Sequence, residues 1–243
     1  MRIGETFRYS RPYDPKPLYI DGLPNYFNHT FTEGCRLALL DAGINPIQKL
    51  ESVTGIRCPA ILISSSPHKI GSAETPWQDF FDPDRGHIRY FGDNKVFGTD
   101  PAVAPGNKAL LEQFGLHTSP NMSQRNKACP IIFFRRVAIG PRAKGNVQFQ
   151  GFGIIARAER ITQFDRRSKS TFTNYVFDFV VFNMLAENEI FSWQWISLRR
   201  DPNCSSNAIL AAAPASWRLW VNEGQSAVDK CRRRIVKLLT VTS

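Results

Sequence analysis

Apolar and polar residues alternate along the middle of the chain, whereas toward the C-terminus apolar residues recur at helical spacing. The alternating or continuous apolar runs are rich in β-branched and aromatic residues, which is typical of strands. The predicted strands cover residues 59–63, 78–82, 87–92, 130–139, 147–161 and 171–183. Gly151 and Gly153 lie inside one of them, where glycine usually marks a bulge or the close approach of another backbone.

Helix boundary signals predict the remaining elements. Thr32 is a suitable N-cap for one helix, which Gly43 ends. Asn45 and Pro46 open a second helix, which Gly55 ends. Further helices are expected over residues 108–114, 192–200, 214–221 and 225–239.

The first part of the chain, residues 1–31, is rich in Pro, Tyr and Asn. We expect it to wrap the domain as an ordered arm, because its aromatic side chains require burial. Those side chains are Tyr9, Tyr13, Tyr19, Tyr26 and Phe27. Strands in the middle of the chain and helices on both sides of them indicate the α+β class.

Large aromatic and acidic side chains gather in one predicted hairpin, residues 75–95. Its turn, Asp-Pro-Asp-Arg-Gly, has Pro and Gly where a tight turn favours them. Trp77, Asp79, Tyr90 and Asp93 therefore lie on the strands or at their ends. Rings and carboxylates held in this way are what a pocket for a small molecule or a base requires.

Two further aromatic residues of the hairpin, Phe80 and Phe81, are more simply explained as core residues. The acidic side chains are harder to explain in that way, because the chain as a whole carries a formal net charge of +10 and a pI of about 9.6. Such a charge indicates a polyanion or an acidic surface as the partner.

Nearly all of the net positive charge falls between residues 124 and 169, which hold eleven Lys or Arg and two acidic residues. Because they are interleaved with predicted strands, several should share one face. Phosphate neutralisation by such a patch supplies most of the sequence-independent affinity for nucleic acids. The alternative is an ordinary solvated basic face.

An acidic, aromatic pocket beside a phosphate-binding patch suits one ligand in particular. A carboxylate accepts a hydrogen bond from the exocyclic amine of cytosine, and aromatic rings stack on the base. A pocket that encloses both faces of a base requires the base to turn out of the duplex, at a cost of a few kcal/mol. Stacking, at ~1–3 kcal/mol per base, offsets a cost of that size.

Other classes of site find no support in the sequence. The five cysteines lie far apart, without metal or disulfide spacing, and the four histidines are expected to be surface or loop residues. The histidines are His29, His68, His87 and His117. We therefore expect no metal, no cofactor and no catalytic residue. The most apolar stretch, residues 176–185, is too short to span a bilayer, so we expect a cytoplasmic protein without membrane contact.

Several motifs resemble the N-terminal recognition domain of AspBHI- and MspJI-type modification-dependent restriction endonucleases. They are the hairpin W-x-D-x-x-D-x-x-x-G-x-x-x-Y-F-G-D-N-K, the strand V-Q-F-Q-G-F-G-I-I and the tail W-Q-W-I-x-x-R-R-D…A-P-A-S-W-R-L-W-V. The resemblance runs from about Pro59 to Gly224. It implies an SRA-like fold, a curved β-sheet or partial barrel flanked by helices, in a prokaryotic restriction system. It also implies double-stranded DNA containing 5-methylcytosine or 5-hydroxymethylcytosine as the partner, recognised by base flipping.

The same resemblance assigns roles to individual residues. Trp77 and Tyr90 match ring-stacking positions, and either Asp79 or Asp93 matches the carboxylate that reads the cytosine edge; Asn94 completes the expected pocket. Loops are expected to contact the DNA backbone and grooves. Their candidate residues are Ser65, His68, Lys69, Lys95, Arg142, Lys144, Arg166, Arg167 and Lys169.

The chain departs from this family pattern after Gly224, where KCRRRIVKLLTVTS predicts a basic helix rather than a nuclease domain. We expect a recognition domain over residues 1–224 and, over 225–243, a helix that links to a nuclease domain or forms a homo-oligomer. The chain is then either a truncated recognition domain or a stand-alone reader. Two alternatives stay open: an RNA-binding module, and a metal-dependent nuclease. The nuclease residues would be Asp79, Asp82, Asp93 and Lys95.

Overall fold

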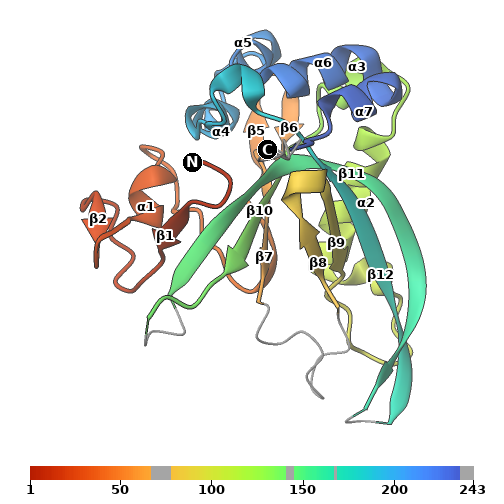
Figure 1. The fold of residues 1–243 in the computed structure, drawn as a ribbon. Helices are drawn as coiled ribbons and strands as arrows, with labels where there is room; N and C mark the ends of the chain where they lie inside the picture. Colours follow the sequence, from red (N-terminus) through yellow and green to blue (C-terminus); the bar gives the residue numbers. More distant parts are fainter. Residues whose placement is uncertain (67–77, 141–144, 167–168, 236–243) are drawn as a thin grey trace, which may run out of the picture.

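An eight-stranded sheet, curved so that its two edges approach each other, forms the body of the protein in the computed structural model (Figure 1). The structure describes residues 1–66, 78–140, 145–166 and 169–235. The strands, in their order across the sheet, are β4 (Gly43–Pro46), β7 (Ile61–Ser65), β10 (Ile131–Arg136), β11 (Asn146–Asp165), β12 (Ser170–Val181), β9 (His87–Phe91) and β8 (Phe80–Asp82). A further strand, β1 (Thr6–Arg8), pairs with the beginning of β11. Apart from the parallel pair β7 and β10, the pairs are antiparallel.

The longest strand, β11, bends over the top of the sheet and joins its two halves. Its first part pairs with β10, its second with β12, and the register shifts next to Phe133 and again next to Ile155. Gly151 adopts a φ of 111°, and a Cβ on Gly153 would lie 1.8 Å from the carbonyl oxygen of Val180. The prediction that these glycines mark bulges and close backbone contact is confirmed. Because of the bend, both ends of β11 point to the lower end of the molecule (Figure 1).

Two hydrophobic cores lie on the two sides of this sheet. The inner one packs α2 (Pro105–His117) against residues such as Ile63, Phe133 and Phe177. The outer one packs the N-terminal arm and the C-terminal helices against the opposite face, with Trp195 and Trp220 among its fully buried side chains. Burying an aliphatic or Phe side chain stabilises a fold by ~1.5–3 kcal/mol, so the outer core binds the N-terminal arm and the C-terminal helices firmly to the sheet.

The helices of the outer layer are short. They are α1 (Tyr26–His29), α3 (Met122–Arg125), α4 (Gln194–Arg200), α5 (Ser206–Ala211), α6 (Ala215–Glu223) and α7 (Val228–Cys231). The 3-10 turns are η2 (Pro83–Arg85), η3 (Pro101–Val103), η4 (Leu185–Glu187) and η5 (Gly224–Ala227). Two small hairpins complete the fold: β2 (Tyr19–Ile20) with β3 (Leu23–Pro24), and β5 (Leu50–Ser52) with β6 (Gly55–Arg57). Figure 1 shows α3 to α7 together above the sheet, far from its lower end.

The predicted helices over residues 32–43 and 45–55 are wrong. Residues 35–42 are irregular, and the second segment forms the edge strand β4 and the β5–β6 hairpin. Ile44 pairs with Ile63 of β7, so strand pairing outweighs the local helical pattern. Pro46 is compatible with an edge strand because it needs to donate no hydrogen bond there, and Gly and Pro signal turns as well as helix ends.

The predicted helix over residues 225–239 is also largely wrong. Helical structure ends at Cys231, and the chain then runs extended, with Arg233 N–H donating to the carbonyl of Val181. Arg233 is buried and pairs with Glu189. Residues 236–243 lie outside the described residues. The described part of this segment therefore packs with the outer core, which includes Cys231.

Three other side chains lie where the sequence did not place them. Phe80 is 50% exposed and Tyr19 67% exposed, although both were expected to be buried. His117, expected at the surface, is fully buried in α2: its Nε2–H donates to the carbonyl of Cys129 and its Nδ1 accepts from the N–H of Ile155. Burial lowers the pKa of His117 to about 3, so it remains neutral and holds α2 to the bulge in β11.

Candidate nucleic-acid interface

Asp79 lies where the two edges of the curved sheet meet, directly before β8. Its Oδ2 accepts a hydrogen bond from Ser65 Oγ at the end of β7, at 2.9 Å. Its Oδ1 accepts from the backbone N–H of Phe91 at the end of β9, at 3.2 Å. One carboxyl thus ties together β7 and β9, which lie in the two opposite halves of the sheet. Ser65, predicted as a groove contact, is buried, and its hydroxyl holds this candidate reader.

The environment of Asp79 disfavours the ionised form of its carboxyl group. Burial raises the pKa of this carboxyl to about 6, although the hydrogen bonds from Phe91 and Ser65 lower it. Near neutral pH the group therefore exists both ionised, when it only accepts hydrogen bonds, and protonated, when it can also donate one. A partly buried acid with such a pKa is a common feature of functional sites.

Asp93, the other candidate reader, is bound to the start of α2. Its Oδ2 accepts from the N–H of Gly106 at 2.9 Å, and its Oδ1 accepts from the N–H of Asn107 at 3.1 Å. In return Asn107 Oδ1 accepts from the N–H of Asp93 at 3.1 Å. Ala104, the N-cap residue of α2, has no side-chain oxygen to do this, so Asp93 caps the helix from a distance.

Tyr90 and Asn94 are both buried near these carboxylates. Tyr90 is part of the inner core, and burial together with the charges of Asp79 and Asp93 raises the pKa of its hydroxyl. Asn94 donates to the carbonyl of Thr173 at 2.7 Å and accepts from the N–H of Val96. Asn94 thereby holds the loop after β9 to β12 at Thr173, beyond Val176, which pairs with the last residue of β9.

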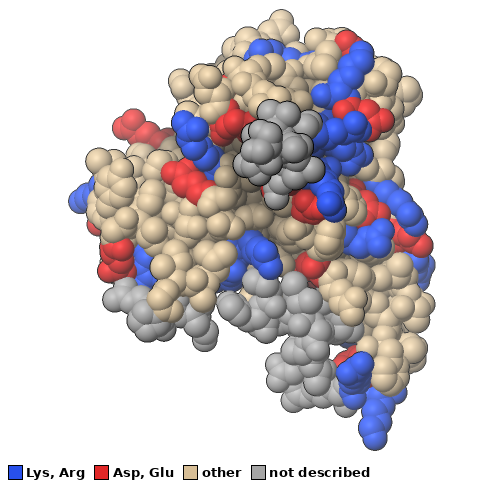
Figure 2. Space-filling view, in the orientation of Figure 1, with Lys and Arg blue, Asp and Glu red and all other residues tan. Residues whose placement is uncertain are grey.

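The predicted loop residues are only partly within the described chain. Lys95, Arg166 and Lys169 are exposed, and the last two lie at the tip of the arm formed by β11 and β12. Figure 2 shows basic side chains at the lower tip of this arm. The remaining candidates lie outside the described residues: Trp77, His68, Lys69, Arg142, Lys144 and Arg167.

Three of the described basic residues between 124 and 169 bond to other groups of the protein. Arg125 is buried and donates to backbone carbonyls, and Arg136 donates to the carbonyl of Leu40. Arg157 pairs with Glu159. The excess charge in the sequence thus includes cations that stabilise the fold.

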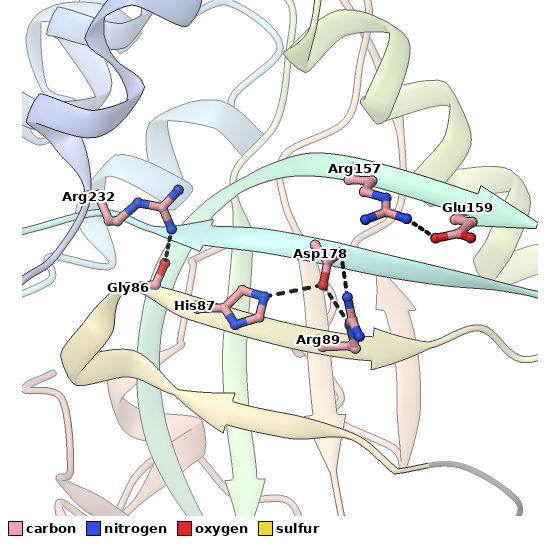
Figure 3. A network of polar contacts seen from close by, with 7 residues as sticks. All are labelled: Gly86, His87, Arg89, Arg157, Glu159, Asp178 and Arg232. Carbon is pink, nitrogen blue, oxygen red and sulfur yellow. Dashed lines mark hydrogen bonds and ion pairs between the residues drawn. The ribbon is translucent and has the colours of Figure 1, made fainter.

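The outer face of β9, β11 and β12 carries charges of both signs (Figure 3). Asp178 accepts two hydrogen bonds from Arg89, at 2.8 and 3.1 Å, and lies 3.2 Å from His87 Nε2. These contacts lower the pKa of Asp178 although burial acts in the opposite direction. Blue and red side chains alternate over this surface in Figure 2, so it is not a continuous basic patch.

The acidic residues of the hairpin do not converge on a metal site. Asp82 caps η2 by accepting from the N–H of Arg85, at the opposite end of β8 from Asp79. Three residues of strand separate the two acids by roughly 10 Å. Among the described residues, no three His, Cys, Asp or Glu side chains are grouped so that they could hold a metal ion. This geometry gives the nuclease alternative no support.

The fold itself is SRA-like, and it agrees with the sequence relationships of the chain. Residues 41–231 match the family described as "Restriction endonuclease AspBHI N-terminal". The chain belongs to this family of recognition domains from modification-dependent restriction endonucleases. The comparison with curated proteins gave no match. No helix in the described part of the chain is long and apolar enough to cross a membrane.

Among solved structures, the MspJI restriction endonuclease in complex with a 27-mer oligonucleotide is 34% identical, with a TM-score of 0.90. The match covers 100% of this chain and 56% of that one, so this chain spans little more than half the length of MspJI. The DNA recognition domain of the cytosine modification-dependent endonuclease LpnPI is 19% identical, with a TM-score of 0.63, over 93% of this chain and 88% of that one. AspBHI, a DNA modification-dependent endonuclease, is 17% identical, with a TM-score of 0.62, over 97% and 94%. The last two show a shared fold.

Proposed function

We propose that this chain binds double-stranded DNA and recognises 5-methylcytosine or 5-hydroxymethylcytosine, turned out of the duplex into a pocket beside Asp79. The observation that carries the proposal is the partly buried carboxyl of Asp79, fixed by Ser65 and Phe91 at the lower end of the sheet. Membership of a recognition-domain family supports it. A DNA-bound relative that covers the whole chain at 34% identity supports it as well.

The chemistry of Asp79 fits a cytosine edge. An ionised carboxylate accepts a hydrogen bond from the exocyclic amine of the base. A protonated carboxyl can in addition donate to a ring nitrogen, and a pKa of about 6 makes both forms accessible. Its position is held from two directions, so the acceptor needs no reorganisation when the base enters.

Both carboxylates accept a hydrogen bond at each oxygen, so the choice between them rests on their roles: Asp93 caps the N-terminus of α2, whereas burial raises the pKa of Asp79 to about 6. We therefore assign base reading to Asp79 and helix capping to Asp93. Tyr90 is 7% exposed, so its ring forms the floor of the pocket rather than a free stacking surface. Stacking from the other side is assigned to Trp77 by its place in the hairpin sequence.

The proposed role of the rest of the protein follows from the length comparison. MspJI is nearly twice as long as this chain, so a nuclease domain is the proposed partner for cleavage. Exposed Arg166 and Lys169 at the tip of the β11–β12 arm are proposed to contact the DNA backbone or a groove.

The test is a fluorescence-polarisation comparison of one duplex with and without a single modified cytosine, at matched salt, since affinity depends steeply on salt. Asp79→Asn places an amide where cytosine presents a donor, and an unsatisfied buried donor costs ~1–3 kcal/mol. We expect this variant to lose at least about tenfold in affinity for the modified duplex, and Asp93→Asn to retain the preference. Equal preference in wild type and Asp79→Asn would remove Asp79 from the site.

A further inference from the structure

A cleft of about 420 Å³ opens beside the lower half of β12, apart from Asp79. It lies between the loop that follows β9 and the arm formed by β11 and β12. Six side chains define its chemistry: Phe97, Thr99, Arg160, Thr162, Thr171 and Thr173. The loop wall is held in place by Asn94, which bonds to the carbonyl of Thr173 and accepts from the hydroxyl of Thr99.

The polar groups of this cleft are available to a ligand. Arg160 is exposed, and within the described residues it makes no hydrogen bond or ion pair with another side chain. Its neighbour on the same strand, Arg157, pairs with Glu159, and Arg89 pairs with Asp178. A guanidinium without an ion-pair partner among the described residues, in a cleft that threonines also line, is suited to bind a phosphate.

Exposed aromatic rings adjoin the same cleft. Phe97 is 72% exposed, and Phe164, which pairs with Thr171 across the strands, is 53% exposed. Large apolar side chains grouped at the surface next to polar groups indicate a binding surface. A ring at this place offers a flat apolar face for a sugar.

The charge of the cleft limits what it can hold. Asp100 is its one carboxylate among the described lining residues, and its Oδ1 accepts from the N–H of Ala102. One guanidinium and one carboxylate give the lining no net charge, which disfavours a free polyphosphate. A phosphodiester, with a single charge and an adjoining sugar, matches one guanidinium, several hydroxyls and a ring.

We propose that this cleft binds one nucleotide unit of the DNA strand that flanks the modified cytosine. Its phosphate bonds to Arg160 and the threonine hydroxyls, and its deoxyribose packs on Phe97. The inference rests on the proposed function, because it takes DNA as the ligand and lies at the end of the sheet that holds Asp79. The cleft begins six residues after Phe91, whose N–H binds Asp79.

The experiment combines variants of the full chain with a duplex in which single phosphates are replaced by neutral methylphosphonates, one position at a time. In wild type, neutralising the bound phosphate should weaken binding about tenfold or more, the size expected for one charge-assisted hydrogen-bonded contact. In Arg160→Gln, a methylphosphonate at that position should no longer change the affinity, and the slope of log affinity against log salt concentration should fall by about 1. Thr162→Val and Phe97→Ala should weaken binding of the same duplex without changing the preference for the modified base.

Arg157→Gln is the matched control, since it removes an exposed arginine from the same strand at a position outside the cleft. If Arg160→Gln and Arg157→Gln give the same methylphosphonate profile as wild type while wild type still prefers modified DNA, the cleft inference is overturned and the proposed function stands. If wild type binds DNA without preference for the modified base, the proposed function fails. The methylphosphonate profile and the salt slope of Arg160→Gln then still show whether the cleft binds a phosphate. Thermal unfolding of each variant serves as the control that the fold is intact.

Discussion

Replacing Asp79 by Asn should stabilise the protein, because the present carboxyl opposes folding at neutral pH. The amide is nearly isosteric: its oxygen can accept from the N–H of Phe91 and its nitrogen can donate to Ser65 Oγ. What the change removes is the cost of holding a charge in a partly buried position.

The magnitude follows from the pKa of Asp79, which burial raises from 3.8 to about 6. A raised carboxyl pKa in the folded state gives a stabilising contribution that is fully present below pH 3.8 and is lost as the pH rises through 6. A shift of about 2 units corresponds to about 3 kcal/mol between these limits, as an upper figure for a group that retains some solvent contact. We expect Asp79→Asn to unfold with a free energy about 1–3 kcal/mol higher at pH 8 and nearly equal at pH 3.5.

Urea unfolding followed by tryptophan fluorescence at pH 3.5, 5, 6, 7 and 8 measures this difference. The buried tryptophans of the outer core report unfolding of the whole domain. A difference between the two proteins that stays constant over this range would refute the reasoning, since it would show that Asp79 ionises as freely in the folded chain as in the unfolded one. Together with the expected loss of DNA preference, a gain in stability would show that this carboxyl is retained for binding.

Three other changes test the architecture. Asp93→Asn keeps only one acceptor oxygen for the two N–H groups at the start of α2, and should lower the unfolding free energy in urea by ~1 kcal/mol without altering preference for modified DNA. Gly153→Ala would bring a Cβ within 1.8 Å of a backbone oxygen; a melting temperature equal to wild type would contradict the packing of β11 on β12. Replacing Arg166 and Lys169 by Ala should weaken modified and unmodified duplex alike and reduce the salt slope by about 2, and an unchanged slope would exclude the tip of the arm from the interface.

The strands could be predicted from the sequence because their signals are local. The β8–β9 hairpin and the long strands β10, β11 and β12 each contain an apolar run of their own, and Gly151 and Gly153 mark the bend. The helix expected after Asn45 is wrong because pairing with β7 is a non-local contact. Nothing in the residues around Ile44 shows that a partner strand lies some 17 residues further on.

The sequence could indicate which residues form the candidate site, but not which of them contact one another. The hairpin sequence indicated a carboxylate reader, yet it did not distinguish Asp79 from Asp93, since the distinction depends on the distant partners Ser65 and Gly106. The cleft at Arg160 had no sequence signal beyond one arginine in a basic segment. The carboxylate beside Arg157, Glu159, lies two residues further along the same strand, but only the pairing of β11 with β12 brings Thr171 and Thr173 to the cleft that Arg160 lines.

The central claim is that a modified cytosine leaves the duplex and is read by Asp79. A duplex with 2-aminopurine next to the target cytosine measures this directly, because its fluorescence rises when the stack opens. The account predicts brightening when wild type binds the modified duplex, and much less brightening with Asp79→Asn at protein concentrations that saturate the DNA. Tight binding of the modified duplex without a change in fluorescence, or equal brightening with Asp79→Asn, would contradict it.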